Sequence, residues 1–126
     1  MLLDTHALLW FFAGDKRLSD QAREAIEASD NTRLFSDASL WEISIKQSIG
    51  KLVLEEPFAE NLSASLQRNA IDSLPIEKSH IFGVASLPFH HRDPFDRLLI
   101  SAAIVEGLPI VTDDPAYRDY PVELVW

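Results

Sequence analysis

The chain has 126 residues, 47 % hydrophobic and 25 % charged, a balance typical of one folded domain, so we expect a single domain over residues 1–126. With 11 basic and 20 acidic residues, the formal net charge of −9 argues against broad, tight, non-specific binding of nucleic acid, but not against its cleavage. The absence of cysteine excludes disulfides and thiolate metal sites, and the lack of an apolar run of about 18 residues or a signal peptide predicts a cytoplasmic protein without a membrane span.

The first part of the chain predicts two strands, each paired with a helix. Met1–Asp4 is short and apolar, and predicts a buried strand that ends at Asp4. The apolar run Ala7–Phe12 fits a helix that begins directly after this strand. A second helix is expected over Asp20–Ala28, with Ser19 as its N-cap, and Arg33–Ser36 predicts the second strand.

The middle of the chain predicts three helices and a short strand. A helix is expected over Ala38–Ile49, with Gly50 in the position that favours a left-handed residue. Pro57 is suited to begin the next helix. Ile71–Pro75 predicts a short strand, and Lys78–Val84 a short helix.

The last third completes an alternating pattern. Asp93-Pro94 is a strong helix start, and the helix is expected to continue to Glu106. Pro109–Thr112 predicts a strand, and Val122–Trp126 a last strand at the edge of the sheet. Strands that alternate with helices predict an α/β domain with layers and a mostly parallel sheet.

Four acids stand where strands end or helices begin: Asp4, Glu42, Asp96 and Asp114. In an open parallel sheet, ligands bind beyond the carboxyl ends of the strands, and we place Glu42 and Asp96 in the first turns of helices that start at this edge. Clustered carboxylates hold hard divalent cations, and such ions can promote phosphodiester hydrolysis. The set therefore predicts a small metal-dependent nuclease.

Each acid also has a simpler structural interpretation. Glu42 can complete a capping box with Ser39, Asp96 suits the positive end of a helix, and Asp114 can form a turn. Asp4, among apolar neighbours, is the hardest to explain in this way. Taken singly, capping or turn formation is the better explanation for three of them, and only the complete set favours a site.

Four further residues are candidates for supporting roles. Asp93 is interpreted mainly as a helix cap and secondarily as an outer group of the site. Thr112 can orient a carboxylate through its hydroxyl, or simply end a strand. His6 lies one turn from Asp4, and His91, in a loop with His90, is expected to touch substrate or one of the acids rather than a metal.

Taken together, these motifs resemble the PIN-domain family, and within it the VapC-type toxins of type II toxin–antitoxin systems. The resemblance covers nearly the whole chain and implies a three-layer α/β/α fold with a central, mostly parallel sheet. It rests on Leu3-Asp4-Thr5, Ser39-Leu40-Trp41-Glu42-Ile43, Asp93-Pro94-Phe95-Asp96-Arg97-Leu98-Leu99-Ile100 and Ile110-Val111-Thr112-Asp113-Asp114.

The resemblance implies a metal-dependent endoribonuclease that cuts RNA phosphodiester bonds. Carried over to this chain, the metal ligands and catalytic residues are Asp4, Glu42, Asp96 and Asp114, which would hold Mg²⁺ or Mn²⁺ with support from Thr112. The family also implies a homodimer and a cognate antitoxin that blocks the acidic pocket.

Other classes of protein place acids at strand ends too. A receiver module would need a lysine late in the chain, and none follows Lys78. A dehalogenase-like phosphatase would need Asp-x-Asp where the chain has Asp4-Thr5-His6. A PIN-like nuclease that processes RNA, or a PIN-like module that only binds RNA or protein, remains an alternative to the toxin.

Overall fold

The central feature of the fold is a five-stranded sheet with the order β3-β2-β1-β4-β5, in which every neighbouring pair is parallel. The computed structural model describes all residues from 1 to 126. All five predicted strands are present, and the last is at an edge as predicted. The strands are β1 (Leu2–Leu3), β2 (Arg33–Ser36), β3 (Ile71–Leu74), β4 (Ile110–Val111) and β5 (Leu124–Val125).

Six α-helices connect the strands; five were predicted to within one or two residues at both ends, and the sixth, α4, begins directly after Pro57 as expected. Local signals explain their ends: the Ser19 hydroxyl accepts the Ala22 N–H, and Gly14 ends a helix with φ of +62°. A short 3-10 helix after β4 was not predicted. The helices are α1 (Thr5–Ala13), α2 (Asp20–Glu27), α3 (Asp37–Ser48), α4 (Phe58–Arg68), α5 (Lys78–Val84), α6 (Pro94–Glu106) and the 3-10 helix η1 (Pro115–Asp119).

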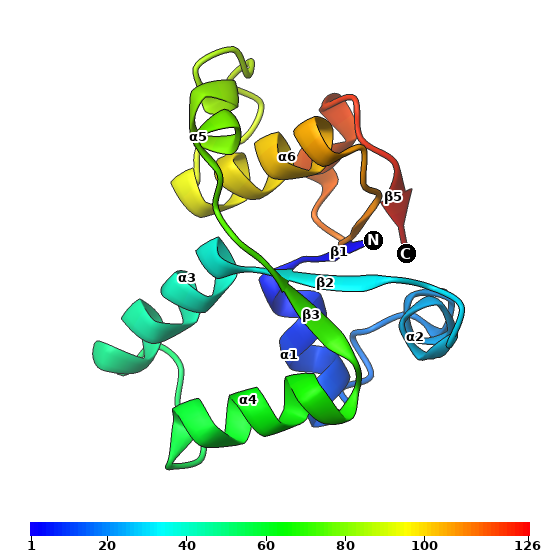
Figure 1. The fold of residues 1–126 in the computed structure, drawn as a ribbon, viewed down its shortest axis with the longest axis vertical. Coiled ribbons are helices and arrows are strands. Elements are labelled where there is room, and N and C mark those ends of the chain that lie inside the picture. The colour runs from blue at the N-terminus through cyan, green and yellow to red at the C-terminus, as the bar shows by residue number, and fades with distance from the viewer.

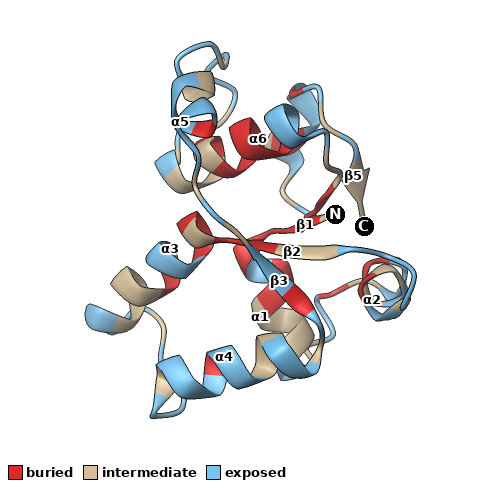
Figure 2. Ribbon diagram, viewed as in Figure 1, coloured by how far each residue is buried: buried red, intermediate tan, exposed pale blue.

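The sheet is the middle of three layers, as expected. In Figure 1, α5 and α6 lie on one side of the strands, and α1 and α4 on the other. The inner strands β1 and β4 are buried between them, whereas the edge strands β3 and β5 are partly exposed (Figure 2). Successive residues of the inner strands enter different cores. Leu3 and Val111 pack in the core that includes α1, whereas Leu2 and Ile110 pack in the core that includes α6. None of the helices is both long and apolar enough to cross a membrane.

The register of the strands determines where polar side chains can meet. Leu3 pairs with Phe35 of β2 on one side and Val111 of β4 on the other. The residues that follow β1 and β4, Asp4 and Thr112, therefore leave the sheet side by side. The chain continues from β1 to β2 on one side and later returns to β4 on the other, so this edge lies at a switch in strand order, where ligands bind in open α/β sheets.

Candidate metal centre

Three of the four predicted acids line one cavity of about 290 Å³ at the carboxyl edge of the sheet. Asp4 follows β1, Asp96 lies in the first turn of α6, and Asp114 begins η1. The fold thus brings together residues that are up to 110 positions apart in the sequence (114 − 4). The rest of the lining consists of His6, Trp10, Asp113 and Pro115.

Asp4 is a buried carboxylate with too few hydrogen-bond donors. It is only 4 % exposed; Oδ2 accepts a hydrogen bond of 2.8 Å from the Thr112 hydroxyl, but Oδ1 is buried without a partner. Burial raises the pKa of Asp4, and the nearby charge of Glu42 raises it further, against the lowering by Thr112 and His6. An unpartnered buried carboxylate oxygen is costly, and a bound cation would offset that cost.

Asp96 is held by a buried tyrosine that the sequence did not single out. The Tyr117 hydroxyl donates to Asp96 Oδ1 at 2.8 Å. Burial raises the pKa of Asp96 to about 6, and the charges of Asp4 and Asp93 act in the same direction. Burial and the neighbouring acids also raise the pKa of the Tyr117 phenol far above its usual range, so the phenol remains a hydrogen-bond donor.

The raised pKa of Asp96 predicts a pH-dependent stability. Because the folded protein binds this proton more tightly than the unfolded chain, the stabilisation is complete below about pH 4 and is lost as the pH rises through about 6. We expect a loss of up to roughly 3 kcal/mol in the free energy of unfolding of the metal-free protein. Urea unfolding in EDTA from pH 4.5 to 7.5 measures it. Asp96→Asn should remove this part of the pH dependence, and an identical profile in the variant would contradict the assignment.

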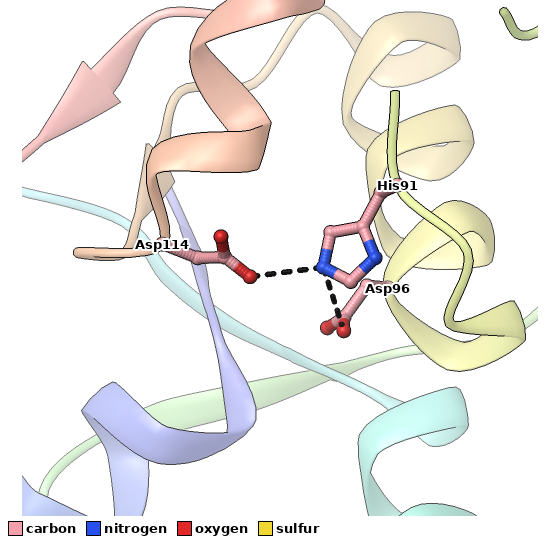
Figure 3. A group of neighbouring side chains, drawn as sticks. All are labelled: His91, Asp96 and Asp114. Carbon is pink, nitrogen blue, oxygen red and sulfur yellow. Dashed lines mark hydrogen bonds and ion pairs between the residues drawn. The ribbon is translucent and has the colours of Figure 1, made fainter. Parts of the chain in front are cut away.

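His91 joins Asp96 to Asp114. Its Nε2 lies 2.9 Å from Asp114 Oδ2 and 3.1 Å from Asp96 Oδ2, so the imidazole bridges the two carboxylates (Figure 3). Nδ1 accepts the backbone N–H of Asp93 at 3.1 Å, which leaves the ring proton on Nε2. His91 therefore donates to Asp114, and the same nitrogen contacts Asp96, in line with the expectation that it touches an acid.

Thr112 links the two acids at the ends of β1 and β4. Its hydroxyl donates to Asp4 and accepts the backbone N–H of Asp114 at 3.2 Å. The other end of Asp114 is fixed as well, since Oδ1 accepts the Ala116 N–H at 2.9 Å and caps η1. The Thr112 hydroxyl thus contacts a carboxylate, as its expected supporting role requires.

Glu42 lies beside the cavity rather than in its lining. It is 4 % exposed, and its Oε2 is 3.1 Å from Lys46 Nζ, one helical turn further along α3. Its placement in the first turn of α3 was wrong: Ser36, not Ser39, is the N-cap, so Glu42 is in the second turn. The capping box with Ser39 is excluded for the same reason. The charge of Glu42 still acts on Asp4.

The remaining candidates divide between the site and the scaffold. Asp93 caps α6 by accepting the N–H groups of Phe95 and Asp96 at 2.8 and 3.1 Å, which confirms its main interpretation. His6 is exposed at the cavity and packs against Trp10. Outside the site, His80 is buried against Glu106, and the ring of His90 lies against that of Tyr120.

Three residues that the sequence analysis did not assign to the site shape it. Tyr117 holds Asp96, Lys46 neutralises Glu42, and Arg97 fixes the loop that carries His91. Only Lys46 had a local signal, because Glu and Lys four residues apart on a helix form pairs. Tyr117 acts through a contact with Asp96, 21 positions away, and Arg97 acts through backbone carbonyls. Neither kind of contact has a sequence pattern.

The group suits a hard divalent cation. Every acidic donor is a carboxylate oxygen, and magnesium and manganese prefer oxygen ligands. Asp4 Oδ1 has no partner, and burial raises the pKa of both Asp4 and Asp96, so a bound cation would stabilise their charged forms. Asp96 and Asp114 also offer carboxylate oxygens within 4.8 Å of each other.

Comparison with known proteins gives a consistent result. The family model described as PIN domain matches residues 1–123. Ribonuclease VapC22 of Mycobacterium tuberculosis is 29 % identical over 121 residues, which cover 95 % of this chain and 91 % of that protein.

Solved structures share the fold at low sequence identity. VapBC2 from Rickettsia felis, bound to a DNA fragment from the promoter, matches with a TM-score of 0.72 at 20 % identity and covers 98 % of this chain and 95 % of its own. A toxin–antitoxin complex from Klebsiella pneumoniae matches with a TM-score of 0.66 at 15 % identity, over 95 % of this chain and 92 % of its own. FitAcB from Neisseria gonorrhoeae matches with a TM-score of 0.62 at 17 % identity, over 98 % of this chain and 94 % of its own.

Proposed function

This chain belongs to the PIN-domain family, and from that premise we propose that it is a metal-dependent endoribonuclease and the toxin of a toxin–antitoxin pair. The similarity to Ribonuclease VapC22 supports the reaction, and the likeness to a toxin–antitoxin complex supports the biological role. Residues 1–126 would act as one domain, in the cytoplasm. The observation that carries the proposal is the buried Asp4 oxygen without a partner, beside two further acids in an open cavity.

The ligands of the ion in this proposal are Asp4, Asp96, Asp114 and Glu42, with Mg²⁺ or Mn²⁺ as the cofactor. When bound, the ion would supply Lewis-acid stabilisation of the charge that develops on the phosphate oxygens. The protein's own groups prepare the site. Thr112 orients Asp4, Tyr117 orients Asp96, and the backbone of η1 orients Asp114, so the carboxylates are fixed before substrate arrives.

Basic groups next to the acids support an RNA substrate. A second cavity, of about 480 Å³, is lined by Lys46 and Lys51 and shares His6 with the acidic cavity. Lys51, together with Lys46, which pairs with Glu42, would supply a local basic rim beside the acids, although the net charge is −9. A phosphate that neighbours the scissile one would fit between the two ammonium groups.

We expect Lys51→Gln to raise the KM for RNA by roughly threefold to tenfold and to leave kcat nearly unchanged. Lys51 is exposed and forms no ion pair, so its loss removes a phosphate contact and little else. Steady-state cleavage at several salt concentrations measures the effect. The slope of log(1/KM) against the logarithm of the salt concentration should decrease in magnitude by about one. Lys78→Gln, on α5 across the sheet, is the matched control. Equal effects of both variants would show that Lys51 acts only through net charge.

An apolar groove supports an antitoxin partner. It has a volume of about 480 Å³, lies between α1 and α4, and shares His6 and Trp10 with the acidic cavity. A protein segment with an apolar face could fill the groove and extend directly to the acids. The apolar lining consists of Leu9, Trp10, Phe12, Ala13, Leu52, Leu54, Phe58 and Leu62.

A homodimer is part of the same proposal. Large apolar side chains are exposed on α3, on α5 and in the loop after α5, and a second copy would cover them. Trp41, Phe82 and Phe89 are 60 %, 72 % and 81 % exposed.

Induced expression in a host without an antitoxin tests the toxin role. Growth arrest accompanied by RNA fragmentation, and absent with Asp114→Asn, is the expected result. Normal growth with abundant, folded and active wild-type protein would favour an RNA-processing enzyme instead.

A further inference from the structure

The imidazole of His91 lies where a cation would bridge Asp96 and Asp114. Its Nε2 is 3.1 and 2.9 Å from their Oδ2 atoms (Figure 3). A Mg²⁺ or Mn²⁺ ion bound to the same two oxygens would lie about 2.1 Å from each. Both positions are between the same carboxylates, and the ion and the N–H group would be too close to coexist there.

His91 is not arranged to be a ligand of that ion. The Asp93 N–H occupies the lone pair of Nδ1, so Nε2 carries the proton and has no lone pair for a metal. A ligating histidine normally has the opposite arrangement, in which the second nitrogen donates its N–H. The ring therefore offers the acids a hydrogen-bond donor in place of a cation.

The loop that carries His91 is fixed more firmly than its ring. The buried Arg97 guanidinium donates to the carbonyls of Pro88 at 2.9 Å and His91 at 3.3 Å, and the Tyr120 hydroxyl accepts the His91 N–H at 2.9 Å. The ring itself is held by the Asp93 N–H, by its contacts with the two acids and by an edge contact with the Tyr117 ring. To clear the space, the side chain would have to rotate out of these contacts while the loop stays in place.

We propose that His91 is a built-in competitor of the metal ion: its ring nitrogen lies between Asp96 and Asp114, donates to Asp114, and must rotate away before a cation can bind both acids. This inference rests on the proposed metal site, because it concerns the same carboxylates. In this positioning role, His91 orders the two acids in the metal-free protein. The same contacts lower the affinity of the site for metal. Removal of the side chain should then strengthen metal binding.

Titration calorimetry with Mn²⁺ and with Mg²⁺ tests the proposal. We expect His91→Ala to bind each ion about tenfold more tightly than the wild type, since a hydrogen bond to a charged group contributes about that factor. His91→Gln, which can retain an N–H near the Nε2 position, should bind more like the wild type. His90→Ala is the matched control, because His90 contacts Tyr120 rather than the acids.

Nitrogen-15 NMR of the histidine rings gives a second readout that does not depend on activity. Addition of diamagnetic Mg²⁺ should shift the His91 ring signals and leave those of His90 in place. Equal or weaker binding by a folded His91→Ala protein, when the wild type binds metal, would overturn the competitor role alone. Failure of both the wild type and His91→Ala to bind either ion would instead overturn the metal site, and this inference with it.

Discussion

Replacement of Asp96 by asparagine should reduce RNA cleavage by at least about a hundredfold in a protein that remains folded. That factor is the scale for removal of one pre-organised group that stabilises developing charge. Asp96 lies in the first turn of α6, and Tyr117 and His91 hold its two oxygens. Asparagine retains the size and the acceptor for Tyr117, so the loss would come from the charge and from the oxygen that faces His91.

Single-turnover cleavage, with circular dichroism to verify folding, measures this effect. The matched control is Asp72→Asn, an exposed acid on the edge strand β3, which should retain nearly full activity. A folded Asp96→Asn protein with wild-type activity would remove Asp96 from the catalytic set.

Replacement of Asp4 by asparagine should abolish cleavage and also stabilise the metal-free protein. Asp4 Oδ1 is buried without a partner, so removal of the charge ends an uncompensated desolvation. We expect the free energy of unfolding in EDTA to rise by about 1–3 kcal/mol, because a buried carboxylate without a partner costs more than a buried amide without one. Mn²⁺ should stabilise the wild type but have little effect on the variant.

A second substitution should change the stability of the metal-free protein in the opposite direction. Thr112→Val keeps the shape of the side chain and removes the only hydrogen bond to Asp4 Oδ2, so it should destabilise the metal-free protein. Urea unfolding of both variants, with EDTA or with Mn²⁺, provides the comparison. A destabilised Asp4→Asn protein would show that the charge of Asp4 is already compensated without metal.

The elements of the fold were predictable because their signals are local. Ser19 and Asp93 each cap the helix that follows by accepting backbone N–H groups, and Gly107 ends α6 in the left-handed conformation. The edge at which the acids meet was also predictable, because it follows from parallel strands. Asp4 stood out because a charged residue among apolar neighbours has few structural explanations.

The connections within the site were not predictable in the same way. The Thr112 bond to Asp4 spans 108 positions, and the His91 contact with Asp114 spans 23. Such contacts depend on the final packing of β1, β4 and α6, which no local pattern encodes. Glu42 was assigned to the wrong turn of α3 because two serines can cap a helix there. Ser36 is the N-cap rather than Ser39.

The most direct test of the central claim is cleavage of a mixed RNA pool by the protein purified free of any partner protein. The reaction is followed in Mg²⁺ or Mn²⁺, in EDTA, and with Asp4→Asn. We predict cleavage that requires metal and disappears both in EDTA and with the variant. Cleavage that persists in EDTA, or with a folded Asp4→Asn protein, would contradict a metal-dependent nuclease built on these carboxylates.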